Sequence, residues 1–441
     1  MKKILLFVLL ASSFIANAQF WTEKATRFTT PDRGIYSMSI VDANVVWAIA
    51  FDNTIIPADV TIKEFTRSTD GGNTWTPGTI NLGPNTSAFG TSSITAISST
   101  TAWVSVYGDP SNPGGIWKTI DGGLTWNKQT TASFTVNSYV NFVHFWDANN
   151  GIAHGDPESG EFEIYITSDG GTNWTRVAGA NIPDPDSGGE YGYENLYEVS
   201  GNNIWFGTDI GRIYKSTDKG LTWTVNTVPS PSTDFQLDTF TFSDTDPNKG
   251  FLVLYYSQKL FSTLDGGLNW SEVIKTGNLY NTDIALIPGT SILVSASSAN
   301  PKGSSYSIDN GLSWINIDGI PHGTLSFLND SFGFSGGLNT NATTGGIYKF
   351  SGVPLKAPSF DIKNKIVAYP NPTNGIVYLN SENLVIKEAS VFDLLGRQVY
   401  LSKFSALNNV TLDLKSLQFG TYVLKVTSDS GKTETMKIMK N

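Results

Sequence analysis

The chain has 441 residues, a formal net charge of -10 and no cysteine. Without thiols it has no disulfide, no cysteine nucleophile and no cysteine-ligated zinc or iron-sulfur site, so its stability has to come from buried apolar surface. The negative charge disfavours nucleic acid and anionic lipid as partners, because both carry charge of the same sign.

The first residues have the pattern of a secretory signal peptide. Two lysines and an apolar run fill residues 2–15, and Ala16-Asn17-Ala18 has the small-x-small form that signal peptidase cleaves. We therefore expect residues 1–18 to be removed once the chain reaches the periplasm. The apolar run is shorter than the roughly 20 residues of a membrane helix, and no later segment reaches that length, so the sequence predicts no membrane span.

An eight-residue motif then occurs six times. Its first copy, from Ser68 to Trp75, reads STDGGNTW, and successive copies begin 44 to 51 residues apart. A period of that length indicates stacked or radial copies of one supersecondary unit. Every copy holds an aspartate and a tryptophan at the same two positions: Asp70, Asp121, Asp169, Asp218, Asp265 and Asp309, with Trp75, Trp126, Trp174, Trp223, Trp270 and Trp314.

The residues around the second copy predict four short strands. They are Ser93–Ser98, Trp103–Tyr107, Gly115–Thr119 and Trp126–Gln129, with turn residues between them. Four strands per unit are typical of a propeller blade, and the motif is then the hairpin turn between the third and fourth strands. There the aspartate can accept hydrogen bonds from turn amides and the glycines can adopt positive φ, so we interpret the motif as structural and not catalytic.

The motif resembles the Asp-box, or bacterial neuraminidase repeat, whose pattern Ser/Thr-x-Asp-x-Gly-x-x-Trp all six copies match. The resemblance covers residues 21 to about 355. It implies a β-propeller similar to those of sialidases, xyloglucan hydrolases, sorting receptors and photosystem II assembly factors. Because those families differ in activity, the resemblance implies a fold and no single function.

Strands at the two ends of the repeat region complete one further blade. Gly323–Leu328, Phe332–Ser335 and Gly346–Phe350 follow the sixth motif without a fourth strand, and Phe20–Ala25 resembles the outer strands of the other units. Pairing these segments closes the ring and hides the strand edges that an open array exposes. We therefore predict a seven-bladed propeller over residues 19–355.

The remaining residues predict a linker at 356–365 and a small β-sandwich at 366–441, which gives an all-β chain of two domains. The alternating run from Tyr422 to Val426 is typical of a strand with one buried face. Three stretches, Tyr369–Gly375, Val391–Val399 and Phe419–Val426, resemble in order and spacing the C-terminal sorting domain of the type IX secretion system of Bacteroidetes. The resemblance implies that the secretion machinery is a partner and that the protein is secreted or held at the outer-membrane surface.

The mouth of the propeller opposite the motif turns is the expected ligand face. Loops between second and third strands, and links between blades, place carboxylates and tyrosines there, which suit sugars, cations or a basic partner. The predicted ligand-binding residues are Asp109, Asp156, Asp209, Tyr191, Tyr193 and Arg33. The candidates for catalysis are Asp156, Glu190, Glu194 and His154. For Asp109 and Asp156, each in a Gly-Asp-Pro sequence, turn formation is the competing interpretation.

Two hypotheses follow. The first is a monomeric binder of a protein or glycan. The second is a carbohydrate-active enzyme, a glycoside hydrolase or polysaccharide lyase, since a glycosidase needs paired carboxylates about 5 to 10 Å apart. A typical sialidase is disfavoured because only Arg33 and Arg212 are predicted to reach the ligand face, and three arginines are needed there. The sequence predicts no cofactor and no defined metal site, and it leaves calcium binding by loop carboxylates open.

Overall fold

The computed structural model describes residues 19–54, 61–109, 111–229, 236–353, 366–381, 385–429 and 433–441. The predicted signal peptide and linker lie outside these residues. The chain divides into two compact units, the first ending at residue 354 and the second beginning at residue 355. Among the described residues, no helix is long and apolar enough to cross a membrane.

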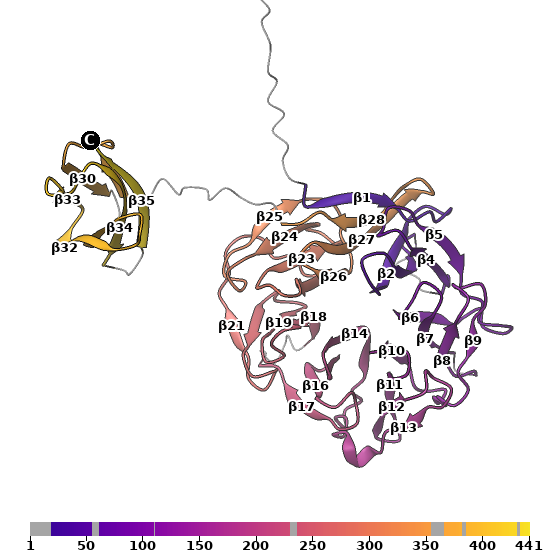
Figure 1. Ribbon diagram of the computed structural model, residues 1–441. Helices are drawn as coiled ribbons and strands as arrows, with labels where there is room; N and C mark the ends of the chain where they lie inside the picture. Colours follow the sequence, from indigo (N-terminus) through magenta and orange to yellow (C-terminus); the bar gives the residue numbers. More distant parts are fainter. Residues whose placement is uncertain are drawn as a thin grey trace, which may run out of the picture. The chain divides into compact units, whose positions relative to one another are not determined.

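The first unit is a ring of seven antiparallel blades, and in each blade the first strand lies innermost (Figure 1). Blades one to three consist of β2(Arg33–Ile40), β3(Val46–Asp52), β4(Glu64–Ser68) and β5(Thr76–Thr79), then β6(Gly90–Ala96), β7(Ala102–Tyr107), β8(Gly115–Thr119) and β9(Asn127–Lys128), then β10(Val140–Phe145), β11(Gly151–Glu158), β12(Glu161–Thr167) and β13(Thr175–Arg176). Blades four to six consist of β14(Gly192–Ser200), β15(Asn203–Thr208), β16(Arg212–Ser216) and β17(Thr224–Thr227), then β18(Leu237–Phe242), β19(Gly250–Leu254), β20(Leu260–Thr263) and β21(Ser271–Val273), then β22(Asp283–Leu286), β23(Leu293–Ser297), β24(Gly303–Ser307) and β25(Ile315–Asp318).

The seventh blade joins the two ends of the repeat region. It consists of β26(Leu325–Asn329), β27(Phe332–Asn341), β28(Thr344–Phe350) and the N-terminal strand β1(Trp21–Ala25). β1 pairs antiparallel with β28, with Trp21 opposite Phe350 and Ala25 opposite Gly346. The predicted seven-bladed ring, closed by the N-terminal strand, is confirmed.

The hydrophobic core of the ring is divided among the interfaces between neighbouring blades. Seven buried clusters each combine residues of two adjacent blades. Flat aromatic contacts cross several of these interfaces. For example, the rings of Trp103 and Phe145 stack with centroids 3.6 Å apart, and those of Trp205 and Phe242 stack at 4.0 Å. Because each blade buries both faces against neighbours, the ring needs all seven interfaces for full burial.

The turn formed by the eight-residue motif has the same hydrogen bonds in all six copies, and the fifth copy shows them. The Thr263 hydroxyl donates to Asp265 Oδ1 at 2.8 Å, and the Gly267 main-chain N–H donates to Thr263 Oγ1 at 3.1 Å. Asn269 donates to both carboxylate oxygens, from its main chain at 2.9 Å and from its side chain at 2.8 Å. The two glycines after Asp265 have φ of 75° and 96°, a region that residues with a Cβ rarely adopt.

Replacing Asp265 with asparagine should lower stability at pH 7 by about 1 kcal/mol, because the turn loses charge-assisted hydrogen bonds. Hydrogen bonds from the Asn269 main chain and side chain lower the pKa of Asp265 to about 2 from 3.8. The stabilisation is therefore present above pH 3.8 and is lost as the pH falls through 2. Thermal melts from pH 2 to 7 should show the gap between wild type and variant closing in acid. Asp330→Asn, on an exposed turn, is the control, and an equal gap at pH 2 would contradict the assignment.

The second unit is a small β-sandwich, as predicted. One sheet has the order β29(Ile366–Tyr369), β30(Ile376–Ser381) and β33(Asn409–Asp413), and the other has β32(Gln398–Leu407), β31(Ile386–Phe392), β34(Gly420–Ser428) and β35(Thr433–Lys440). Their inner faces share one buried core, which includes Leu379 and Leu412 from the first sheet and Val391 and Leu424 from the second.

Candidate functional site

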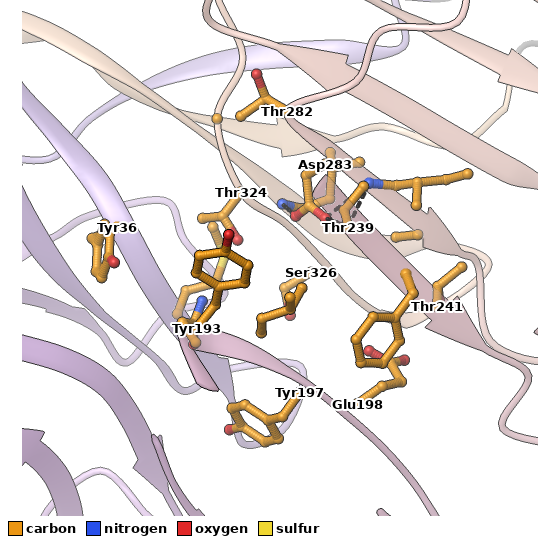
Figure 2. Close-up of a pocket in the computed structure, with 18 of the residues that line it drawn as sticks. Tyr36, Tyr193, Tyr197, Glu198, Thr239, Thr241, Thr282, Asp283, Thr324 and Ser326 are labelled. Carbon is orange, nitrogen blue, oxygen red and sulfur yellow. Dashed lines mark hydrogen bonds between the residues drawn. The ribbon is translucent and has the colours of Figure 1, made fainter. Parts of the chain in front are cut away.

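A cavity of about 1100 Å³ lies at the centre of the ring. Its wall is built largely from the innermost strands of the blades, and Figure 2 shows side chains from several of them around the same space. All seven blades contribute side chains, and blades four, five and six contribute the most. The chemistry of the cavity is therefore composed of residues that lie far apart in the sequence.

The cavity wall is rich in carboxyl groups and, among the described residues that line it, contains no lysine or arginine. The acids are Glu194, Glu198, Asp238, Asp244 and Asp283. His144 also lines the wall, but burial, assisted by repulsion from Lys219, lowers its pKa to about 4, so it is neutral near pH 7. The wall therefore carries negative potential that no neighbouring cation in it offsets.

Glu198 is an acid in the wall whose pKa is strongly raised. It lies in β14 opposite Trp205, and its side chain faces the cavity (Figure 2). Burial raises its pKa to about 8 and repulsion from Asp283 adds to the shift, while hydrogen bonds with the Phe242 main chain and Thr241 oppose it. The carboxyl group is therefore largely protonated at pH 7 and can donate a hydrogen bond.

Replacing Glu198 with glutamine should stabilise the protein at pH 9 and change little at pH 5. The folded pKa of about 8 lies above the ordinary value of 4.5, so the contribution of Glu198 to stability is complete below pH 4.5 and is lost as the pH rises through 8. Since the side chain keeps part of its surface in the solvated cavity, we expect a gain of about 2 kcal/mol at pH 9. Chemical denaturation at both pH values measures it, with the exposed Glu272→Gln as control. Equal differences at pH 5 and pH 9 would show that Glu198 does not titrate in this way.

Asp238 and Asp283 lie in the innermost strands of the next two blades, β18 and β22. Burial raises the pKa of Asp283 to about 6, although its carboxylate accepts hydrogen bonds from the Leu325 main chain at 2.7 Å and from Thr239 at 2.8 Å. Burial raises the pKa of Asp238 to about 7, a hydrogen bond from Asn281 at 2.7 Å opposes the shift, and repulsion from Asp283 adds to it. Asp283 is thus close enough to both Glu198 and Asp238 to raise their pKa values.

A second group of acids gathers where the inner strands begin. Burial raises the pKa of Asp156 to about 6, against hydrogen bonds from the Asn141 side chain at 2.7 Å and the Gly192 main chain at 3.0 Å. Repulsion from Glu194 and Asp209 also contributes to the shift. Burial likewise raises the pKa of Glu194, which accepts a hydrogen bond of 2.7 Å from the Tyr36 hydroxyl.

Tyrosines surround these acids. The Tyr191 main chain donates to Asp209 at 2.9 Å, and the Tyr191 ring lies edge-on to Tyr193 with centroids 5.8 Å apart. Tyr255 and Tyr256 are also edge-on to each other at 5.0 Å, and they are 52% and 66% exposed. Tyr193, Tyr255 and Tyr256 all line the cavity, so exposed aromatic surface lies beside the carboxyl groups.

Two of the sequence-predicted residues lie outside this group. His154 is 1% exposed, stacks on Phe142 with centroids 4.9 Å apart, and has a pKa lowered to about 3 by burial. Asp109 lies in the turn after β7, where its carboxylate accepts hydrogen bonds from the Ser111 main chain at 2.9 Å and hydroxyl at 2.6 Å. Their contacts are those of a core histidine and a turn-forming aspartate.

Two further predicted residues are held in ion pairs. Glu190 is buried, and Arg212 contacts its carboxylate at 2.6 Å. Arg33 is 8% exposed and contacts Asp52 at 2.6 Å and Glu64 at 3.2 Å. Both predicted arginines of the ligand face are thus neutralised by carboxylates of the protein, and Glu190 fixes the link before β14.

The sequence-based prediction missed Glu198, Asp238 and Asp283 because it looked for acids in loops. Each lies in or beside an innermost strand, where a charged side chain has to face either the core or the central cavity. An acid in the first strand of a blade was therefore the available signal. The prediction also treated Tyr193 and Glu194 as part of a link, whereas β14 already begins at Gly192. Among the described residues, no group of three or more His, Asp or Glu side chains is arranged to hold a metal ion.

Comparison with known families concerns the second unit. Residues 367–441 match the family described as the secretion system C-terminal sorting domain. The tail is a type IX sorting domain. The protein is therefore exported to the cell surface or secreted, and its tail engages the secretion machinery, as the sequence predicted. No curated protein sequence matches the chain.

Solved structures resemble the first unit in fold. YCF48 from Cyanidioschyzon merolae has a TM-score of 0.55 at 17% identity, with 75% of this chain and 98% of that chain covered. A structure of YCF48 bound to D1 peptide has a TM-score of 0.50 at 16% identity, with 76% and 97% covered. PorZ of Porphyromonas gingivalis, a surface component of the type IX secretion system, has a TM-score of 0.50 at 13% identity, with 94% of this chain and 60% of PorZ covered. The TM-scores show a shared propeller fold, and at these sequence identities they show the fold alone.

Proposed function

We propose that this exported protein binds a protein or glycan ligand at the central cavity of its propeller, as a binder and not an enzyme. The observation that carries the proposal is the cavity itself, about 1100 Å³ in volume and lined by tyrosines and hydroxyl side chains from several blades. Large concave sites with a few converging polar groups are where proteins bind ligands. Of the predicted ligand-binding or catalytic residues, Tyr193 and Glu194 line this cavity. Asp156, Asp209 and Tyr191 lie beside them.

One propeller of similar fold supports this function. The YCF48 structure described as bound to D1 peptide shows that a propeller of this architecture can hold a peptide. The sorting tail places the present protein outside the cell, where soluble glycans and surface proteins are the available ligands.

A binding screen tests the proposal. The mature protein, beginning at Gln19, is applied to a glycan array and to a peptide library. We expect at least one ligand class to bind. Glu194→Gln, which removes a carboxyl group from the cavity wall, should weaken binding several-fold. Glu272→Gln, on an exposed outer strand, should bind as the wild type does. Failure of the folded protein to bind any glycan or peptide would refute the proposal.

The second candidate function is a carbohydrate-active enzyme acting on extracellular polysaccharide. It is supported by the spread of carboxyl pKa values in the cavity, with Glu198 at about 8 and Asp283 at about 6, since a protonated acid beside an ionised one is what glycoside hydrolysis requires. A hydrolysis screen on neutral polysaccharides distinguishes the two functions. Turnover that disappears in Glu198→Gln would establish the enzyme in place of the binder.

A further inference from the structure

We propose that the ligand of the central cavity is a cationic peptide segment, whose lysine or arginine side chains lie among the five carboxyl groups of the wall. This inference rests on the proposed binding function and narrows its ligand to one class.

The first argument is the charge of the wall. Among the described residues that line the cavity there are five carboxylic acids and no lysine or arginine. The two arginines nearest the mouth are already paired, Arg33 with Asp52 and Glu64, and Arg212 with Glu190. Carboxylates enclosed by protein focus their potential into the cavity, so a cationic group is the occupant whose charge offsets them. An anionic polysaccharide is repelled, and a neutral glycan offsets nothing.

The second argument is the aromatic surface beside these acids. Tyr193, Tyr255 and Tyr256 line the cavity, and the latter two are more than half exposed. Phenol rings attract cations through their faces, and the planar guanidinium of arginine also stacks on them. Tyrosines next to carboxylates therefore favour arginine over lysine within the cationic class.

The third argument is size. A cavity of about 1100 Å³ is at the upper end of the range that small molecules occupy, roughly 300 to 1000 Å³. It accommodates several residues of an extended chain. Hydroxyl groups on the wall, among them Thr282 and Ser326, can exchange hydrogen bonds with a peptide main chain (Figure 2). A single small cation leaves most of that volume and those hydroxyls unused.

The test uses fluorescein-labelled hexa-arginine, hexalysine, hexaglutamine and hexaglutamate with the mature full-length protein at 0.15 M salt, about the physiological level. The pH is 9, where Glu198 and Asp238 are ionised. We expect hexa-arginine to bind more tightly than hexalysine, and the other two not to bind. The variant Glu198→Gln/Asp238→Asn/Asp244→Asn should weaken hexa-arginine binding by about tenfold or more. The matched control, Glu23→Gln/Glu272→Gln/Asp413→Asn, has the same net charge and should weaken it less than about twofold, because these acids lie outside the cavity.

The outcomes separate this inference from the function on which it rests. An equal loss in the two triple variants would mean non-specific attraction to an acidic protein and would overturn the inference. If spermine competed for the site as strongly as unlabelled hexa-arginine, the ligand would be a small cation and the proposal of a peptide would be overturned. Binding of neutral glycans without binding of cationic peptides would overturn the inference and leave the proposed function in place, whereas no binding of either class would remove both. Because the triple cavity variant could unfold, Glu198→Gln alone, which preserves side-chain shape, is measured beside it at pH 9, where Glu198 is ionised, and should weaken binding in the same direction.

Discussion

Replacing Trp21 with alanine should destabilise the mature protein by about 4 kcal/mol, a value typical of a fully buried tryptophan. Trp21 is 3% exposed, it lies in the strand β1 that closes the ring, and its indole N–H donates to Ser304 in the sixth blade at 3.0 Å. Its ring also packs on Phe350 of β28, with centroids 5.9 Å apart. The change therefore weakens two sets of contacts, the pairing of β1 with β28 and the interface between blades six and seven. Chemical denaturation of the full chain measures the loss.

A substitution in the same strand gives the control. Glu23 is exposed and lies opposite Tyr348 in the strand pairing, so Glu23→Ala should change stability by less than about 0.5 kcal/mol. Hydrogen exchange adds a local measurement, since amides of β28 should exchange faster in Trp21→Ala than in Glu23→Ala. If both variants cost the same, β1 contributes only as a surface strand and the ring does not depend on its closure.

Replacing Arg212 with methionine should cost about 3 kcal/mol, because it leaves the carboxylate of Glu190 buried without its cation. Arg212 contacts Glu190 at 2.6 Å and donates to the Asp184 carbonyl at 3.3 Å, so it also holds the link that precedes β14. The double variant Arg212→Met/Glu190→Gln should recover much of the loss, since no unpaired charge remains. Denaturation of the single and double variants completes the cycle.

An exposed ion pair is the matched comparison. Lys259 and Glu272 are 2.9 Å apart, yet both side chains are more than a third exposed, so Lys259→Met should cost less than about 1 kcal/mol. If the double variant were as unstable as Arg212→Met alone, the buried charge of Glu190 would not be the cause. Equal effects at Arg212 and Lys259 would equally contradict a structural role for the buried pair.

Much of the fold was predictable because it repeats. The spacing of aspartate and tryptophan located the hairpin turn of six blades, and the predicted third strand at Gly115–Thr119 coincides with β8. Turn chemistry is local: one carboxylate, two residues of positive φ and nearby amides lie within a few residues of each other. The role of Phe20–Ala25 as the fourth strand of the last blade was also predictable, since the three strands after the sixth motif lacked a fourth.

The site was less predictable, because residues close in the sequence can have different surroundings in the fold, as Glu190 and Glu198 do. The two residues are only eight positions apart, but Glu190 pairs with Arg212, while Glu198 faces the cavity. Burial there, with added repulsion from Asp283, raises the pKa of Glu198. His154 and Asp156 are two positions apart, but only Asp156 lies near Glu194 and Asp209, whereas His154 is buried in the core. Which face a side chain occupies, and what meets it there, depends on the register of strands and the closeness of other blades.

The sequence by itself determined the seven-bladed ring, its closure by the N-terminal strand and the export of the protein. It could do so because turns, strand patterns and sorting motifs each occupy a short contiguous segment. Only the tertiary structure decided which acids share the cavity and which arginines are already neutralised. Those facts arise from side chains that are distant in the chain and meet across the axis of the ring, where burial and mutual repulsion set their charge.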